Sequence, residues 1–306
     1  MNEALVSIAV CTYNGEKYLR EQLESLVHQT YKNLEIIVAD DCSKDGTVAI
    51  LEEYQREYSF FRYYQNPQNL GYKKNFETVV SKCSGEYIAL SDQDDIWDLD
   101  KIRLQVAVIG DATLIYHDSA FMNESGVDMH RKLSDLLTLF QGESPFPFIL
   151  FNCVSGHAIL FKRALLPHIL PFDEHIFHDR WIAFVASLNG GIKVLPQALV
   201  RYRQHPSSET DILRLKPPKK SNEQRTYIAS STIDLIKNYS IRKSRYGLFF
   251  RAFADCFDDD HKLVKRFKLF TLLVGKLDEI FFTSHKSYLS KVNLTRKICF
   301  RKKYQP

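Results

Sequence analysis

The sequence predicts an α/β fold, with a mostly parallel central sheet flanked by helices and a helical C-terminal extension. Two observations predict the sheet: short apolar runs alternate with amphipathic stretches of helical period through residues 6–90, and polar residues follow the apolar runs. A third observation, the rise of basic residues and phenylalanine after Pro206, predicts the extension. Strand–helix alternation implies right-handed crossovers and therefore parallel neighbouring strands.

The first element is a β-branched apolar run at residues 6–10, which is typical of a buried strand. Leu19, Leu23 and Leu26 then recur at helical spacing, which places one apolar stripe on a helix. The same alternation continues along the chain. It predicts strands at residues 34–39, 61–64 and 87–90 and helices at residues 45–58 and 73–82.

Residues 110–205 have a mixed pattern of strands and loops. Four short apolar runs are strand candidates, and an apolar stretch ended by two glycines is a short helix. The strand candidates are residues 114–116, 158–161, 192–195 and 199–203, and the helix is residues 182–188. After Pro206 a basic, proline-containing stretch (216–220) precedes helix-like sequence, so we predict a body at 1–205 and a basic, mainly helical extension at 206–306.

The composition is that of a globular protein, with 45% apolar and 25% charged residues. The longest apolar stretches fall short of the roughly 18–20 residues that span a bilayer. No basic segment leads into an apolar run near Met1, so we expect neither a spanning segment nor a signal peptide. The six cysteines form no C-x-x-C pair, so we expect reduced cytoplasmic thiols and no zinc site.

The net charge of +4 conceals a division along the chain. Residues 206–306 hold 22 Lys+Arg against 10 Asp+Glu, a net +12, which leaves 19 against 27, a net −8, for residues 1–205. A basic appendage on an acidic body suggests an anionic partner, either a membrane or a nucleic acid. The acidic body argues against a nucleic-acid groove through the site, so we expect a membrane surface and no nucleic acid.

Polar residues gather where the predicted parallel strands end, which is where open α/β sheets bind ligands. They are Thr12–Gly15, Asp40-Asp41 and Ser91–Asp95. Asp92 and Asp94, two residues apart, could share one hard divalent cation with diphosphate oxygens. The alternative is an acidic turn that caps a helix near Asp98.

Several of these segments, taken in order, resemble family-2 inverting glycosyltransferases with the GT-A fold, whose nucleotide-binding half is Rossmann-like. The resemblance covers about residues 5–205. The motifs that carry it are Val6–Gly15, Gln29-Thr30-Tyr31, Glu35–Ser43, Asn69-Leu70-Gly71 with Asn75, and Ser91–Trp97. The Asp-Gln-Asp-Asp-x-Trp motif and Tyr202–His205 look most like the rhamnosyltransferase branch of bacterial surface-polysaccharide (O-antigen or capsule) assembly.

The resemblance implies a nucleotide-diphosphate sugar as donor. By this resemblance, Tyr13 packs on the base, Asp41 accepts a hydrogen bond from the pyrimidine N3–H, and Asp92 lies near the ribose. Asp94 would hold Mn²⁺ or Mg²⁺ against the diphosphate. The further donor-binding candidates are Thr12, Asn14, Glu16, Asn69, Gly71, Lys74 and Gln93.

Asp179 falls where this family carries its catalytic base. A carboxylate there can deprotonate an acceptor hydroxyl in line with the anomeric carbon, and a single displacement inverts the configuration. The alternative is a helix N-cap. His178 precedes it where many relatives have Glu, which leaves the role of His178 open.

The resemblance also assigns residues around the metal and the acceptor. His205 resembles a histidine that approaches the metal, or it is an exposed residue before Pro206. Arg203 could pair with the diphosphate or face water. The acceptor candidates are Asp95, Trp97, Gly156, His157, His178 and Trp181; for Trp181 a core position is the preferred interpretation, and for His157 a hydrogen-bonded pocket wall.

The basic extension contains an amphipathic pattern. Phe267, Phe270, Leu273 and Val274 repeat at helical spacing among basic residues, as in helices that lie on anionic membranes. The basic residues are Lys262, Lys265, Arg266, Lys268, Lys297, Arg301, Lys302 and Lys303. The alternatives are a helix packed on the body with its charges solvated, and a homodimer interface.

The sequence thus predicts a metal-dependent inverting glycosyltransferase at the cytoplasmic membrane face, acting on a saccharide, often a lipid-linked one. The candidate donors are dTDP-L-rhamnose and, alternatively, a UDP-sugar. A nucleotidyltransferase would need a basic or Gly-rich triphosphate loop, which Thr12–Glu16 does not supply. A non-catalytic nucleotide-sugar or membrane-surface binding protein is opposed by the joint presence of Asp92, Asp94 and Asp179.

Overall fold

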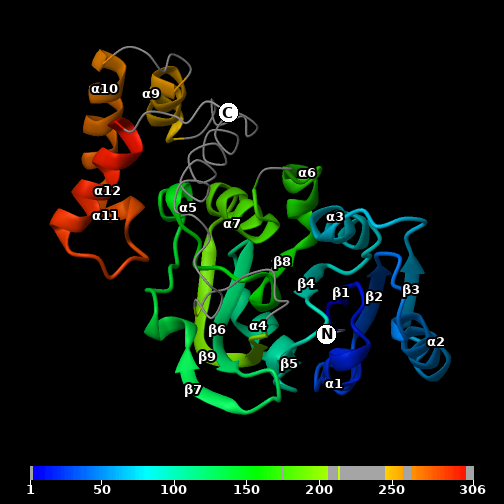
Figure 1. Ribbon diagram of the computed structural model, residues 1–306. Helices are drawn as coiled ribbons and strands as arrows, with labels where there is room; N and C mark the ends of the chain where they lie inside the picture. Colours follow the sequence, from blue (N-terminus) through cyan, green and yellow to red (C-terminus); the bar gives the residue numbers. More distant parts are fainter. Residues whose placement is uncertain (1–2, 174–175, 206–212, 214–244, 258–262, 301–306) are drawn as a thin grey trace.

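A computed structural model describes residues 3–173, 176–205, 213, 245–257 and 263–300 (Figure 1). Its described strands form one sheet in the order β3-β2-β1-β4-β8-β6-β9-β5, with β7 paired to β6. The predicted basic stretch at 216–220, Lys262 and residues 301–306 lie outside the described residues.

The N-terminal half of the sheet is parallel, as the strand–helix alternation predicts. Strand β1 pairs with β2 on one side and with β4 on the other, and β2 pairs with β3. The strands are β1 (Val6–Thr12), β2 (Leu34–Asp40), β3 (Phe61–Gln65) and β4 (Tyr87–Ser91); the helices between them are α1 (Glu16–Val27), α2 (Thr47–Glu57) and α3 (Tyr72–Ser81). Thr12 is in register with Asp40, and Val10 with Ser91, so the loops after β1, β2 and β4 start side by side.

The second half of the sheet is mixed. Strand β8 (Leu160–Lys162) runs antiparallel to both β4 and β6 (Leu114–Met122), whereas β9 (Ile192–Arg203) runs parallel to β6. The short strands β5 (Ile96–Trp97) and β7 (Asp128–Lys132) are antiparallel to β9 and β6. Residues 192–203 form one strand where two were predicted, and residue 158 belongs to a 3₁₀ turn (Gly156–Ala158) that precedes β8.

Helices cover both faces of the sheet, because alternate strand residues point to opposite sides. Ala9 and Cys11 pack with side chains of α3 and of α7 (His178–Leu188). Ile8 and Val10 pack instead with α1, α2 and α4 (Lys101–Ile109). The remaining short helices of the body are η1 (Leu133–Asp135), α5 (Pro147–Leu150), η3 (Arg163–Leu165) and α6 (Leu166–Ile169).

The C-terminal helices extend the core on the α7 face. Phe146, beside α5, has ring contacts with Tyr246, Phe249 and Phe250, and Phe151 contacts Phe281. The helices are α9 (Gly247–Phe257), α10 (Leu263–Val274), α11 (Leu277–Ile280) and α12 (Tyr288–Phe300), and Figure 1 shows them beside α5, away from β1–β3. One hydrophobic cluster thus includes residues from both sides of the predicted boundary at residue 205, which stays a prediction.

The predicted apolar stripe of α10 lies partly in the core and partly on the surface. Leu273 is buried and Phe270 packs against the core, whereas Phe267 is 61% exposed. The packing interpretation therefore holds for part of the stripe, because α10 lies against α9 and α12. Among the described residues, no helix combines the length and the apolar character that a bilayer crossing requires.

Candidate functional site

Two of the loops at the carboxyl edge of the parallel strands are joined by Gln93. Its Oε1 accepts a hydrogen bond from the Tyr13 N–H at 2.8 Å, and its Nε2 donates to the Tyr13 carbonyl at 3.0 Å. A Cβ at Gly15 would overlap the Gln93 carboxamide, so glycine is required for this approach. Tyr13 itself is 46% exposed, which leaves its ring available to a ligand. Gln93, a predicted donor-binding residue, therefore holds the β1 loop in place.

Asp40, the last residue of β2, and Asp41, which follows it, are buried and accept hydrogen bonds from the neighbouring loops. Asp40 accepts hydrogen bonds from the Thr12 hydroxyl at 2.9 Å and from the Ser43 N–H at 2.9 Å. Thr12 is therefore buried and satisfied inside the protein, which differs from its prediction as a base-pocket residue. Asn14 is held in the same way, because its Oδ1 accepts from the Lys44 N–H at 2.8 Å.

Asp41 organises the loop that leads into α3. Its carboxylate accepts from Asn66 Nδ2 at 2.9 Å and from the Leu70 and Gly71 N–H groups at 2.8 Å each. Asn69 also accepts from the Gly71 N–H, at 3.1 Å. A carboxylate offers about four acceptor positions, so Asp41 keeps one for a ligand.

Glu16 and Lys74 are engaged near the surface. Glu16 Oε2 accepts from the Gly46 N–H at 2.9 Å, which ties α1 to the loop before α2. Lys74 Nζ lies 2.6 Å from Glu77 Oε1 on the exposed face of α3, so its charge is partnered within the helix. For Lys74 the structure favours a surface ion pair over the predicted donor contact.

Asp94 and His205 meet at the mouth of the site. His205 Nε2 lies 2.8 Å from Asp94 Oδ2, and the His205 ring packs 5.2 Å from the ring of Tyr18. The end of β9 brings His205 beside the loop after β4. A carboxylate next to an imidazole nitrogen is a donor pair that suits Mn²⁺. The alternative interpretation of His205 as an exposed residue is wrong, since its side chain is only 8% exposed.

Arg203 is a structural residue of this loop, contrary to the predicted diphosphate contact. Its guanidinium is buried and donates to the carbonyls of Asp94 at 2.8 Å and Glu124 at 2.9 Å, and to Glu21 Oε2 at 2.6 Å. The main-chain N–H of Arg203 donates to Asp95 Oδ1 at 3.0 Å. Because each guanidinium nitrogen makes one of these contacts, Arg203 positions the loop at Asp94 rather than meeting a ligand.

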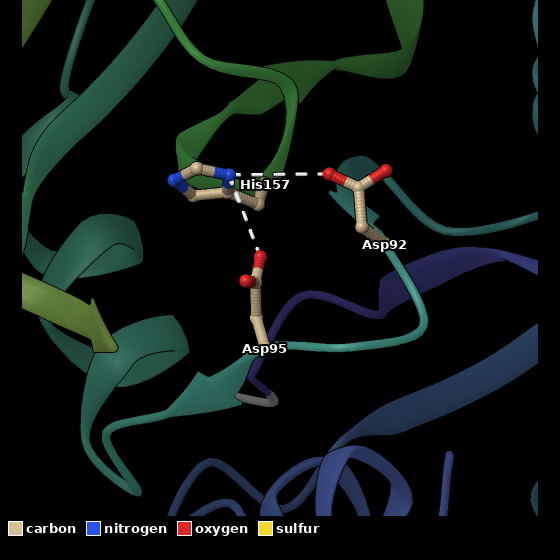
Figure 2. A group of neighbouring side chains, drawn as sticks. All are labelled: Asp92, Asp95 and His157. Carbon is tan, nitrogen blue, oxygen red and sulfur yellow. Dashed lines mark ion pairs between the residues drawn. The ribbon is translucent and has the colours of Figure 1, made fainter. Parts of the chain in front are cut away.

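Asp95, His157 and Lys101 lie beneath the same loop. His157 Nδ1 is 3.5 Å from Asp95 Oδ2 and 3.9 Å from Asp92 Oδ2 (Figure 2). Lys101 Nζ donates to the His157 carbonyl at 2.7 Å. Burial, followed by the nearby carboxylates of Asp94 and Asp92, raises the pKa of Asp95 well above its ordinary value. Burial also lowers the pKa of Lys101 well below its ordinary value and that of His157 to about 3.

These positions correct two acceptor predictions. Asp95 has no solvent-exposed surface, so it cannot touch an acceptor sugar. Trp97 is also buried, with Lys101 Nζ 2.9 Å from its ring centroid, so it belongs to the core rather than to a sugar-stacking platform. No sequence pattern pointed to Lys101, because a lysine on a helix is usually solvated.

Asp179 lies in the first turn of α7, next to Gly156. The helix is capped at Phe177 without a side-chain hydrogen bond, so the N-cap interpretation of Asp179 is wrong. Its Oδ1 accepts the Arg180 N–H at 2.6 Å. Burial raises the pKa of Asp179 to about 6. The Asp179 charge, after burial and Asp94, also raises the pKa of Asp92, so the two carboxylates are close enough to interact electrostatically.

His178 is a buried imidazole without a hydrogen-bond partner on either nitrogen among the described residues. Its ring stacks on Phe76 at 4.3 Å and lies near Tyr72 and Phe172. Burial lowers its pKa to about 3, so the ring is neutral. A Cβ at Gly156 would lie only 3.1 Å from His178 Nε2, so glycine at this position allows the close approach of the imidazole.

Trp181, one turn further along α7, is buried and donates its indole N–H to the Ile169 carbonyl at 2.8 Å. The preferred core interpretation of this residue therefore holds. Ser119 is a residue that sequence reasoning missed: its hydroxyl lies 2.8 Å from His157 Nε2. A serine inside a strand carries no pattern that could have identified it.

Residues 7–170 match the family described as Glycosyl transferase family 2. An uncharacterised protein of Mycobacterium bovis is 31% identical over 209 residues, which is 65% of this chain but only 59% of that protein. An uncharacterised glycosyltransferase of Haemophilus influenzae is 28% identical over 223 residues, 69% of each chain.

Two solved structures resemble the fold. Residues 1–349 of TarS from S. aureus, in complex with UDP-GlcNAc, align with a TM-score of 0.60 at 18% identity, over 97% of this chain and 90% of that one. The mannosyltransferase PcManGT of Pyrobaculum calidifontis, in complex with GDP-Man and Mn²⁺, gives a TM-score of 0.52 at 16% identity, over 95% and 78%. These likenesses establish a GT-A type of α/β fold. With more than half of its length matched to the family, the chain belongs to glycosyl transferase family 2.

Proposed function

We propose that this protein is a metal-dependent inverting glycosyltransferase that moves a sugar from a nucleotide diphosphate to a saccharide hydroxyl. One observation carries the proposal: Asp94, paired with His205 at the carboxyl edge of the sheet, and Asp179, whose pKa is raised, both act electrostatically on Asp92. The family membership supports it, and so does the UDP-GlcNAc complex of TarS.

The donor nucleotide would lie over the loops after β1, β2 and β4. The exposed ring of Tyr13 offers a surface for the base, and Asp41 retains an acceptor position for a base N–H. Asp92, whose side chain is 41% exposed, would lie near the ribose. The contacts of Gln93 with Tyr13 would keep this surface in a fixed shape before the donor binds.

The residues at Asp94 and His205 fit a divalent cation. A carboxylate oxygen and an imidazole nitrogen 2.8 Å apart can turn to one ion with little movement, and donor phosphates would supply the further ligands. The hydrogen bond from Arg203 Nε to the main-chain carbonyl of Asp94 holds the backbone that carries this carboxylate in place. When bound, Mn²⁺ or Mg²⁺ would offset the negative charge that develops on the leaving diphosphate.

Asp179 would act as the general base. A pKa of about 6 leaves it mostly ionised at neutral pH, yet basic enough to accept a proton from an acceptor hydroxyl. That hydroxyl then attacks the anomeric carbon from the side opposite the diphosphate, which inverts the configuration. His178, with its neutral ring packed on Phe76, would form part of the wall of the acceptor subsite beside Asp179.

The finer assignments concern the sugar and the membrane. We propose dTDP-L-rhamnose as donor, with UDP-sugars as the alternative, and a lipid-linked saccharide of surface-polysaccharide assembly as acceptor. The protein would then sit peripherally on the inner membrane face. Leu263, Val264 and Phe267 are exposed at the start of α10 among Lys265, Arg266 and Lys268, a combination that suits an anionic lipid surface.

Calorimetric titration with dTDP and with UDP, each with and without Mn²⁺, tests the nucleotide site. We expect Mn²⁺-dependent binding that Asp94→Asn abolishes, and the preferred base separates the rhamnose-type donor from UDP-sugars. Lys74→Ala, a change in a surface ion pair, serves as the control and should bind like the unaltered protein. Absence of binding by folded protein refutes the proposal, and binding without any sugar transfer favours a non-catalytic nucleotide-sugar protein.

A further inference from the structure

Asp92, Asp95 and His157 form a cluster on the buried side of the loop after β4, distinct from the Asp94–His205 pair. Asp95 and His157 are almost completely buried. Asp95 Oδ2 has no hydrogen-bond partner among the described residues, yet it points at His157 Nδ1 (Figure 2). An unpaired, buried carboxylate oxygen is costly, so its position calls for a positive partner.

The spacing of the three side chains is that of ligands around an ion. His157 Nδ1 lies 3.5 Å from Asp95 Oδ2 and 3.9 Å from Asp92 Oδ2, both too long for good hydrogen bonds. Ligand atoms that bind one cation at about 2.0–2.2 Å are separated by about 3–4 Å. One oxygen or nitrogen from each of the three residues lies within 4.8 Å of the others.

The contacts of His157 are compatible with a role as ligand. Its Nε2 lies 2.8 Å from the Ser119 hydroxyl, which can accept Nε2–H and so leave the Nδ1 lone pair for a cation. Ligating histidines ordinarily donate their second nitrogen to a fixed acceptor in this way. Ser119 is itself buried, which keeps that bond free of competing solvent.

Lys101 is a buried ammonium beside the cluster. It donates to the His157 carbonyl at 2.7 Å and packs over the Trp97 ring, so its position is fixed by other contacts. Its ammonium forms no ion pair with Asp92 or Asp95 in the part of the chain that the structure describes.

We propose that Asp92, Asp95 and His157 hold a second divalent cation of the Mn²⁺ type, separate from the donor metal and bound without nucleotide. The mixed imidazole and carboxylate set favours Mn²⁺ over Mg²⁺. By fixing the Asp92 carboxylate from below, this ion would set the shape of the loop on which the donor rests. The inference goes beyond the proposed function and does not depend on it.

The test uses the full chain, treated with a chelator and then titrated with Mn²⁺ in the absence of nucleotide. Asp94→Asn combined with His205→Gln removes the donor-metal ligands, and we expect one Mn²⁺ per chain to remain. Adding His157→Gln to that background should weaken this binding by at least about tenfold. Adding His117→Gln, which changes another buried imidazole outside the cluster, should leave Mn²⁺ affinity unchanged.

Spin-echo spectroscopy of the bound Mn²⁺ provides a second readout, since it detects a ligating imidazole nitrogen. We expect a nitrogen signal in the Asp94→Asn/His205→Gln protein that disappears with His157→Gln. Circular dichroism establishes that each variant is folded. If the folded double variant binds no Mn²⁺, or binds it without a nitrogen signal, the second site is refuted, while Mn²⁺-dependent nucleotide binding by the unaltered protein would still support the proposed function.

Discussion

Asp179→Asn separates a catalytic base from a structural residue, because the two roles predict opposite effects on stability. Burial raises the pKa of Asp179 from 3.8 to about 6 in the folded protein. At about 1.36 kcal/mol per pKa unit, this corresponds to about 3 kcal/mol of native-state cost for the ionised carboxylate. The side chain is only partly buried by surface area, so the realised cost is smaller.

The sign follows from linkage. Because the folded pKa lies above the unfolded value, the native state holds the proton more tightly. The stability from the protonated carboxyl is present below about pH 4 and is lost as the pH rises to about 6. At pH 7 the carboxylate therefore destabilises the fold. The helix dipole opposes this, since an acid in the first turn of α7 gains about 0.3–1 kcal/mol, which is the smaller effect.

We therefore expect Asp179→Asn to raise the melting temperature at pH 7 by a few degrees, from a net gain of about 1–2 kcal/mol. Sugar transfer should fall by about 10²–10⁴-fold, since the amide cannot accept the proton. In the unaltered enzyme, kcat/KM should fall as the pH drops below about 6. Differential scanning calorimetry and a nucleotide-release assay measure both quantities. A lower melting temperature with full activity would show that Asp179 serves the helix, and the reasoning would be wrong.

Other changes test the parts of the site that the structure newly explains. Gly15→Ala should weaken nucleotide binding, measured by calorimetry, because the added methyl displaces the Gln93 carboxamide. Adding Gln93→Ala to this variant should restore part of the binding. An equal loss in the double variant would contradict this explanation. Arg203→Met should lower the free energy of unfolding by about 2–4 kcal/mol, and with it the melting temperature, whereas Arg201→Met, at an exposed neighbouring site, should change both little. Phe267→Glu should reduce co-sedimentation with anionic vesicles. The control Val127→Glu, at an exposed site on another part of the protein, should not reduce it. Unchanged lipid binding by Phe267→Glu, with a shift from dimer to monomer, would instead assign α10 to a homodimer interface.

The order of the N-terminal elements could be predicted from the sequence because it depends on local periodicity. The apolar runs and helical stripes of residues 6–90 match β1–β4 and α1–α3 to within a few residues. The observed helix boundaries differ from the predicted ones where local signals are weak. Helix α7, for example, starts at His178, whereas the sequence predicted a start at Ile182. A polar first turn offers no apolar periodicity, so its helical state depends on packing.

The sequence by itself determined the family, the parallel half of the sheet and the residue types that gather at its edge. It did so because motif order, hydrophobic period and the carboxyl-end rule are properties of the linear chain. Only the tertiary structure decided which of those side chains face a ligand. His205 contacts Asp94, which lies 111 residues earlier in the chain. Arg203, two positions before His205, instead donates a hydrogen bond to the Asp94 main-chain carbonyl. Asp95 and Trp97 lie beneath the loop rather than on it, because burial and pairing depend on the β9 and α4 segments that pack against them.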